Sequence, residues 1–186
     1  MLNFKQMEIQ YLGGSSFRVK TKKAILVTDP FKKTVADIVI VSRRNEEKIN
    51  PALIKGTTNR PFPFVLPGPG EYEISEVSIL GREWKESLVY IIQAEDMRIA
   101  FLGDFQGKLK DEQLEELNGV DILLVSPKAI EVVNQIEPRV VIPATENPED
   151  FLKNLGVEKI LPLPKLVVNN QNLPEEREVV VLNARD

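Results

Sequence analysis

Apolar and polar residues alternate in short runs along the first hundred positions, a pattern that predicts β-strands. The clearest segments are 7–13, 16–20, 23–30, 36–42, 76–81, 87–95 and 97–104. Gly13 and Gly14 break the first segment from the second. The segment 61–74, "PFPFVLPGPGEYEI", reads as short strands around a stiff turn, because its Gly spacing is not that of a phosphate-binding loop. This half of the chain is therefore predicted to be β-rich.

After Asp104 the pattern changes to alternating helices and strands. Helices are predicted over 110–119, 127–138 and 147–156, and strands over 120–126, 139–144, 157–163 and 177–183. Asn147 is predicted to cap the last helix, with Pro148 at its first position and Gly156 at its end. A shorter helix is expected over 50–56, capped by Asn50. No linker or repeat interrupts the chain, so we expect a single α/β domain over residues 1–186.

The composition is typical of a soluble globular protein. Of 186 residues, 42% are hydrophobic and 28% charged, which argues against disorder. Apolar runs such as "DILLV" are far shorter than the roughly 20 residues that span a bilayer. Residues 1–7 lack the apolar stretch of a signal peptide. We expect a cytoplasmic protein without a membrane partner.

The chain contains no histidine and no cysteine. This excludes disulfides, thiolate nucleophiles and thiolate metal sites, and it removes the commonest metal ligand and general base. Residues 1–60 hold 12 Lys and Arg against 5 Asp and Glu, whereas residues 61–186 hold 12 against 23. We expect the two halves to pack together and neutralise each other. The cations are scattered and hardly interleaved with aromatics, so nucleic acid is not an expected partner.

Eight segments carry a resemblance to a known family. They are "MEIQYLGGSSFRV", "VTDPF", "ADIVIVS", "PGPGEYEI", "IAFLGD", "VDILLV", "QIEPRVVIP" and "DFLKNLGVE". In this order they resemble the metallo-β-lactamase superfamily, in its bacterial metal-dependent hydrolase branch that includes ascorbate-phosphate lactonase-like proteins. The resemblance implies a four-layer αββα sandwich, with the active site along one shared edge of its two sheets.

The resemblance also implies where the family's zinc ligands would fall. The His-x-His-x-Asp-His motif that follows "ADIVIVS" falls on Arg43, Asn45 and Lys48 for the histidines and on Glu47 for the aspartate. A histidine common in the family's "LGHSSF" segment falls on Gly14, and the ligand loop after "GPGEYE" is shortened to "GREWKES". The bridging aspartate is retained as Asp104, and the last histidine falls on Thr145. Arg and Lys have no lone pair for a metal, and Asn is a weak ligand for zinc.

Two hypotheses follow for this edge. In the first, the metal and any cofactor are lost, and Arg43 or Lys48 pairs with Glu47 and a buried Asp104. In the second, Glu46, Glu47, Asp104 and Glu146 hold Mg²⁺ or Mn²⁺ for hydrolysis of a phosphoester or lactone. We favour the first, because the loop 43–48 has three cations against two anions and no histidine remains.

The resulting prediction is a pseudoenzyme: a degenerate hydrolase homologue that binds a ligand or serves a structural role, and has no catalytic residues. Arg43, Arg44 and Lys48 are candidates for binding a small anion. Self-association into a homo-oligomer is the other expected kind of partnership.

Four further residues are given structural readings. Ser15 and Ser16 have no base to activate them and are expected in a hairpin. Asp29 is expected to organise the turn after its strand. Trp84 is expected either to cover the former pocket or to contact another subunit.

Overall fold

Two β-sheets form the body of the protein. The structure, a computed structural model, describes residues 6–43 and 50–185. The first sheet has the order β14-β1-β2-β3-β5-β7, where the strands are β14 (Leu166–Val168), β1 (Met7–Gly13), β2 (Ser16–Lys20), β3 (Ile25–Thr28), β5 (Ile38–Ile40) and β7 (Phe64–Val65). Strands β14 to β3 are antiparallel, whereas β3, β5 and β7 run parallel.

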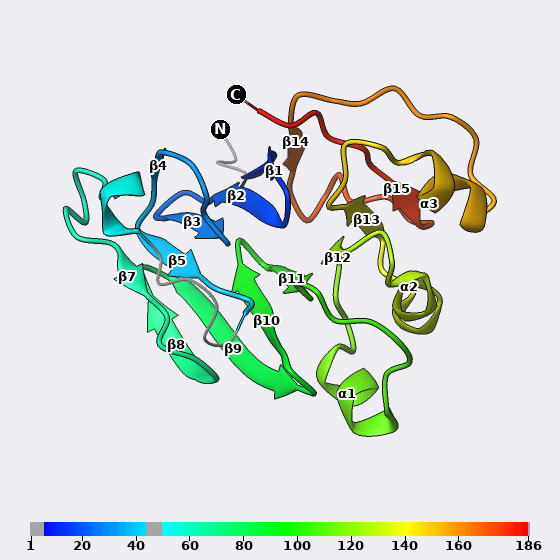
Figure 1. The fold of residues 1–186 in the computed structure, drawn as a ribbon, viewed down its shortest axis with the longest axis horizontal. Helices are drawn as coiled ribbons and strands as arrows, with labels where there is room; N and C mark the ends of the chain where they lie inside the picture. The colour runs from blue at the N-terminus through cyan, green and yellow to red at the C-terminus, as the bar shows by residue number, and fades with distance from the viewer. Residues whose placement is uncertain (1–5, 44–49, 186) are drawn as a thin grey trace.

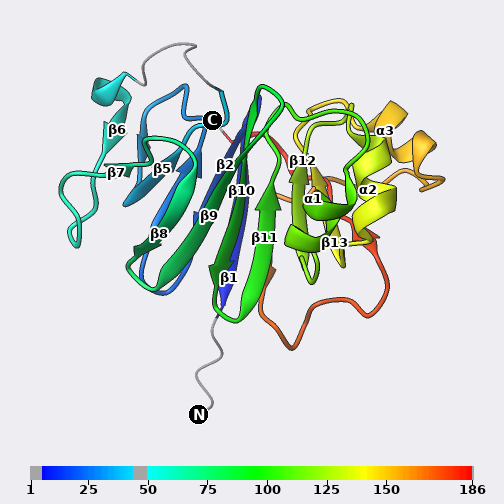
Figure 2. The ribbon, with the colours of Figure 1, turned by 90° about the horizontal axis from the view of Figure 1, so that it is seen from below.

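The second sheet has the order β15-β13-β12-β11-β10-β9-β8. Its strands are β8 (Gly70–Ile74), β9 (Val77–Trp84), β10 (Ser87–Ala94), β11 (Met97–Phe101), β12 (Ile122–Val125), β13 (Val140–Pro143) and β15 (Glu178–Val179). The meander β8 to β11 is antiparallel, and β11, β12, β13 and β15 run parallel. Figure 2 shows the blue strands of the first sheet behind the green strands of the second.

The main core lies between the two sheets because each strand turns alternate residues inward. In β1, Met7, Ile9 and Tyr11 enter this core, while Glu8 and Gln10 lie between them on the other face. A second core lies between the second sheet and α1 (Asp111–Glu116), α2 (Ile130–Ile136) and α3 (Glu149–Asn154). All three helices flank the parallel half of the second sheet (Figure 1).

The outer face of the first sheet is covered differently. A small third core there includes Val27 and Val39, with Ile54 packed against them. Ile54 belongs to β6 (Ile54–Lys55), which pairs with β4 (Thr34–Val35) and follows the 3₁₀ turn η1 (Pro51–Leu53). The predicted sandwich is confirmed, and its outer layer on this side consists, in the described residues, of these short strands and the 3₁₀ turn.

Three predictions about elements need correction. The expected helix over 50–56 is only η1 followed by β6, although the Ala52 amide does bond the Asn50 side chain at 3.0 Å. Asn147 does not cap α3, because the cap position is Pro148 and no side chain bonds there. Residues 157–163 form no strand: only Leu163 makes an isolated bridge, to Leu182, because Pro162 and Pro164 remove the amide donors that a ladder needs.

None of the helices in the described ranges is both long enough and apolar enough to span a lipid bilayer.

Candidate functional site

The carboxyl ends of the parallel strands meet at one edge of the sandwich. Asp29 follows β3 and Ser42 comes shortly after β5 in the first sheet, while Asp104 follows β11 in the second. Backbone contacts join the two sets: the Leu88 amide donates to the Ser42 carbonyl at 2.9 Å, and the Tyr90 hydroxyl donates to the Val41 carbonyl at 3.0 Å. The two sheets are therefore linked by hydrogen bonds at the edge where the superfamily resemblance places the active site.

Asp29 is the half-buried carboxylate of this edge. One of its oxygens accepts a hydrogen bond from the Ser42 amide at 2.7 Å and the other from the Ser42 hydroxyl at 2.6 Å. Burial raises the pKa of Asp29, and the charge of Asp104 raises it further, although hydrogen bonds from Ser42 and Ser15 oppose these effects. Asp29 was predicted to organise the turn after its strand. Its side chain also links the end of β3 to Ser42.

Arg43 and Asp104 form an ion pair across the two sheets. Nε of Arg43 lies 2.7 Å from Oδ2 of Asp104, and an isolated β-bridge joins Arg43 to Ser87. The side chains are 53% and 46% exposed. The expectation that Asp104 is buried is wrong, because the carboxylate projects from the loop after β11 toward solvent. A pair this exposed contributes at most about 1 kcal/mol.

Gly103 holds Asp104 in place. Its φ of +52° lies in the left-handed region, and a Cβ built there would come within 2.4 Å of the Cβ of Ser42. The chain can therefore pass closely over Ser42 only without a side chain at position 103. The same Ser42 thus contacts both Asp29 and the backbone that carries Asp104.

Of the other predicted positions considered next, one belongs to a local turn and five lie outside the described residues. The Thr145 hydroxyl accepts a hydrogen bond from the Asn147 amide at 3.1 Å and donates to the Asn147 carbonyl at 3.2 Å. Thr145 therefore stabilises the turn before α3. The remaining predicted residues, Arg44, Asn45, Glu46, Glu47 and Lys48, lie outside the described residues.

The residues that the structure describes at this edge do not fit a zinc ion. Within residues 6–43 and 50–185, no three His, Cys, Asp or Glu side chains are grouped closely enough to hold a metal. Among the described residues, the carboxylates of Asp29 and Asp104 are already engaged, Asp29 by Ser42 and Asp104 by a guanidinium. An arginine next to a divalent ion would be repelled by it and could not ligate it.

Ser15, Ser16 and Trp84 all have structural roles. The Ser16 hydroxyl donates to the Thr28 carbonyl at 2.7 Å, and the Thr28 hydroxyl donates to the Ser15 carbonyl at 3.1 Å, so the serines do belong to the early hairpin. Trp84 is only 6% exposed and packs edge-on against Phe105, with ring centroids 5.7 Å apart. Both predictions for Trp84 are wrong, because it belongs to the core beneath the helices.

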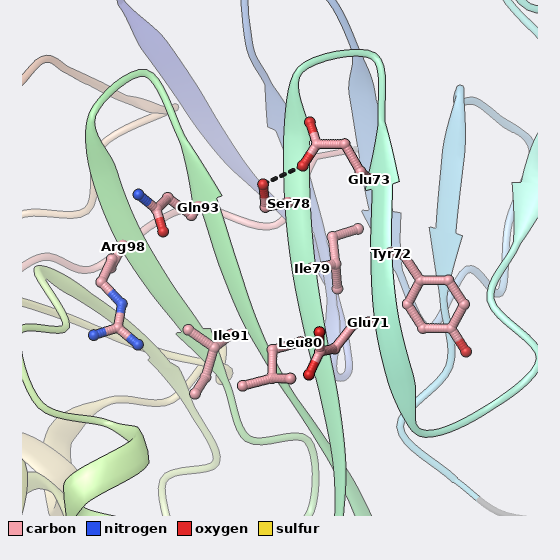
Figure 3. Close-up of a pocket in the computed structure, with 9 residues that line it drawn as sticks. All are labelled: Glu71, Tyr72, Glu73, Ser78, Ile79, Leu80, Ile91, Gln93 and Arg98. Carbon is pink, nitrogen blue, oxygen red and sulfur yellow. Dashed lines mark hydrogen bonds between the residues drawn. The ribbon is translucent and has the colours of Figure 1, made fainter.

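The pocket in Figure 3 lies on the outer face of β8 to β11, away from the strand-end edge. Glu71 and Glu73 lie on one side and Arg98 on the other, with Leu80 and Ile91 between them (Figure 3). The Arg98 guanidinium donates to the Glu116 carbonyl at 3.0 Å and to the Asn118 carbonyl. The position of Arg98 is thus explained by the C-terminus of α1.

Comparison with known families identifies the fold. A family model described as the beta-lactamase superfamily domain matches residues 8–145. A structure from Thermotoga maritima, described as a Zn-dependent hydrolase of the metallo-β-lactamase superfamily, is similar with a TM-score of 0.75 and 26% identity. The similarity covers 95% of this chain and 98% of that chain.

Two more distant structures show the same fold. A metallo hydrolase from Ignicoccus hospitalis has a TM-score of 0.63 and 15% identity, over 88% of this chain and 99% of that chain. A protein from Parabacteroides distasonis, described as a metal-dependent hydrolase, has a TM-score of 0.56 and 17% identity, over 83% and 91%. No curated protein matches the chain by sequence. Together with the two-sheet sandwich, the match over residues 8–145 shows that this chain belongs to the metallo-β-lactamase superfamily.

Proposed function

We propose that this chain is a non-catalytic member of its superfamily that has lost the metal centre and acts by binding. The observation that carries the proposal is the 2.7 Å pair between Arg43 and Asp104 in a chain without histidine or cysteine. A guanidinium supplies next to Asp104 the positive charge that a metal ion would otherwise supply. It offers no Lewis acid and no bound water to activate.

The finer assignment rests on the order of motifs. Arg43, Asn45 and Lys48 would occupy histidine positions, Glu47 and Asp104 the carboxylate positions, and Thr145 the last histidine position. On the same basis we propose kinship with the ascorbate-phosphate lactonase-like branch. The supporting observation is that Arg43, the first of these residues, lies beside Asp104 as a residue at a ligand position would.

A small anion remains the proposed ligand of Arg43, Arg44 and Lys48. Arg43 is engaged with Asp104, so an anion would have to compete with that carboxylate. Replacing all three cations with methionine should abolish binding of inorganic phosphate measured by calorimetry. Unchanged affinity would reject this part of the proposal. Self-association is the other proposed partnership, and light scattering measures it directly.

The loss of the metal is tested on untagged protein. We expect elemental analysis to find far less than one Zn, Mn or Mg ion per chain, and thermal unfolding to be unchanged by these ions or by a chelator. Hydrolysis of a generic phosphodiester and a generic lactone should stay at background with each metal. The Asp104→Asn variant should behave like the unmodified protein in these assays.

The opposite result would identify the alternative enzyme. About one bound ion per chain, with hydrolysis that Asp104→Asn abolishes, would show a hydrolase using a hard cation held by carboxylates. Arg43→Met serves as the matched variant. It removes the guanidinium without touching a carboxylate, so under our proposal it creates no activity.

A further inference from the structure

A second recess opens beside the strand-end edge, and the ion pair does not occupy it. We call it the Phe31 pocket. It has a volume of about 480 Å³ and is lined by Leu12–Gly14, Phe31–Lys32, Glu146 and Ala184–Arg185. The loop that carries Phe31 begins at Asp29, so the pocket adjoins the candidate site through a shared segment.

The floor of the Phe31 pocket is a glycine turn that is held in place. Gly13 and Gly14 have φ values of +101° and +59°, which favour glycine and leave the floor without side chains. The Tyr11 hydroxyl donates to the Gly14 carbonyl at 3.0 Å. The Arg185 amide donates to the Tyr11 carbonyl at 3.0 Å, so the C-terminal wall is attached to the same strand.

One aromatic ring forms the apolar wall. Phe31 is 55% exposed, although its ring lies against the glycine turn: a ring carbon is 3.2 Å from the position that a Cβ of Gly13 would take. The ring therefore has one face supported by backbone and further surface open to solvent. An exposed aromatic of this kind offers a stacking surface for a planar group.

Two charged groups of opposite sign, on Glu146 and Lys32, lie near that ring. The Glu146 carboxylate is 3.7 Å from the position that a Cβ of Gly13 would take. Burial is the main reason that the pKa of Tyr11 is raised to about 12, and the charge of Glu146 is the second. The Lys32 ammonium lies 5.6 Å from the Phe31 ring centroid and donates to the Arg185 carbonyl. An ammonium has three donors, so this contact leaves others for a ligand.

Arg185 reinforces the positive side. Its Nη1 donates to Oε1 of Gln10 at 2.8 Å, and Gln10 is only 5% exposed. The guanidinium is thus held by the buried amide of Gln10, while Arg185 also lines the pocket. The pocket lining therefore includes one anionic residue, two cationic residues and an aromatic ring.

We infer that the Phe31 pocket binds a small zwitterion with a planar apolar body, of the aromatic amino-acid type. Glu146 receives its ammonium group, Lys32 and Arg185 receive its carboxylate, and its ring stacks on Phe31. This inference rests on the proposed function, in that the ligand is bound without being hydrolysed. Opposite charges fix the orientation of the ligand, because reversing it would place like charges together.

The test uses three compounds that share an indole ring. L-Tryptophan carries both charges, tryptamine only the cation and indole-3-propionate only the anion. Titration calorimetry on the full chain should give L-tryptophan an affinity at least about tenfold higher than either analogue. Equal affinity for all three compounds, or no heat from L-tryptophan up to about 10 mM, would overturn the inference.

Variants assign each charge to its residue. Glu146→Gln should lower the affinity for L-tryptophan and for tryptamine by about tenfold and leave the affinity for indole-3-propionate unchanged. Lys32→Met should lower the affinity for L-tryptophan and indole-3-propionate only. Phe31→Ala should lower the affinity for all three compounds. Lys33→Met and Glu149→Gln remove exposed charges that do not line the pocket and should change nothing. Identical losses for the pocket variants and these controls would contradict the assignment.

The two proposals fail separately. A metal-bound, hydrolytic protein would sink the proposed function while leaving the charge preference of the Phe31 pocket measurable. A metal-free, inactive protein with no preference for L-tryptophan would sink only the inference about the pocket.

Discussion

Two carboxylates near the strand-end edge have opposite environments, and burial decides how each behaves. Asp29 is half-buried and accepts hydrogen bonds from both donors of Ser42, whereas Asp104 is more exposed and pairs with a guanidinium. Losing the partner of a buried acid leaves unpaired polar groups, but losing the partner of an exposed acid costs little because water replaces it. The stability of this edge should therefore depend on Asp29 more than on the ion pair.

Asp29→Asn tests the pH dependence that burial imposes. Because the pKa of Asp29 is raised above its ordinary 3.8, the folded chain holds the proton more tightly than the unfolded chain does. The free energy of unfolding contributed by this group thus falls as pH rises from 3.8 through the raised pKa, and is constant above it. Urea unfolding between about pH 4 and 7 should show this fall in the unmodified protein but not in the variant.

Asp29→Ala is the matched comparison. It leaves the Ser42 donors unpaired and puts alanine at a φ of +38°, so it should lose about 1–3 kcal/mol throughout this pH range. Parallel pH profiles for the unmodified protein and Asp29→Asn would contradict the assignment of the buried charge.

Gly103→Ala should destabilise the fold by at least about 2 kcal/mol, because it combines a left-handed φ with an overlap against the Cβ of Ser42. Gly156→Ala is the control: its φ is +68°, but no atom lies within 4 Å of the added Cβ, so it should lose only about 1 kcal/mol. Thermal and urea unfolding of both variants measure the difference. Equal losses would mean that the close approach over Ser42 carries no energy.

At the scale of elements, the termini of short helices depend on contacts from neighbouring strands. Helix α1 has only six residues, and a helix this short is not stable alone. Its C-terminal carbonyls are met by Arg98 from β11, a cation at the negative end of the helix. The sheet thereby fixes where α1 ends. Because Arg98 is held by these carbonyls, it also forms one side of the pocket in Figure 3.

Arg98→Met should cost about 1–2 kcal/mol and speed amide exchange at Leu117–Val120, because two carbonyls at the end of α1 lose a charged donor. Hydrogen exchange followed by mass spectrometry gives the local effect, and urea unfolding gives the global one. Arg139→Met, at an exposed arginine, should change stability by no more than about 0.5 kcal/mol. Unaltered exchange in the Arg98 variant would show that α1 does not need this contact.

At the scale of the whole molecule, the two sheets share one core, and the two halves of the sequence carry opposite net charge. Ile9 and Tyr11 of the first sheet enter the same core as Tyr90 and Phe101 of the second. The basic first half meets the acidic second half where Lys23 lies 3.6 Å from Glu76, as well as at the Arg43–Asp104 pair. These exposed pairs contribute little energy, so the shared apolar core is what joins the halves.

We expect residues 1–186 to unfold as one cooperative unit. Trp84 is the only tryptophan and reports on the core beneath the helices. Its fluorescence should change at the same urea concentration as the far-ultraviolet circular dichroism, which reports on both sheets. Separated transitions would show that the sheets fold as independent units.

The sequence alone determined the chemistry that is excluded and most of the element order. Absence of histidine and cysteine needs no coordinates, and the alternation in β1 gives its inward face directly. The strand expected over 157–163 failed because its prolines outweigh its apolar pattern. The expectation that Trp84 covers the former pocket or contacts another subunit failed, because hairpin sequence does not reveal which face of the second sheet the helices cover.

Only the tertiary structure decided which charged groups meet. Arg43 and Asp104 are 61 residues apart and come from different sheets, so their pairing depends on how the strand ends converge. Asp29 is half-buried and Asp104 exposed for the same reason, since burial is a property of the packed edge rather than of either local sequence. Local pattern sets the elements through backbone geometry, whereas the environment of a side chain is set by distant residues that folding brings to it.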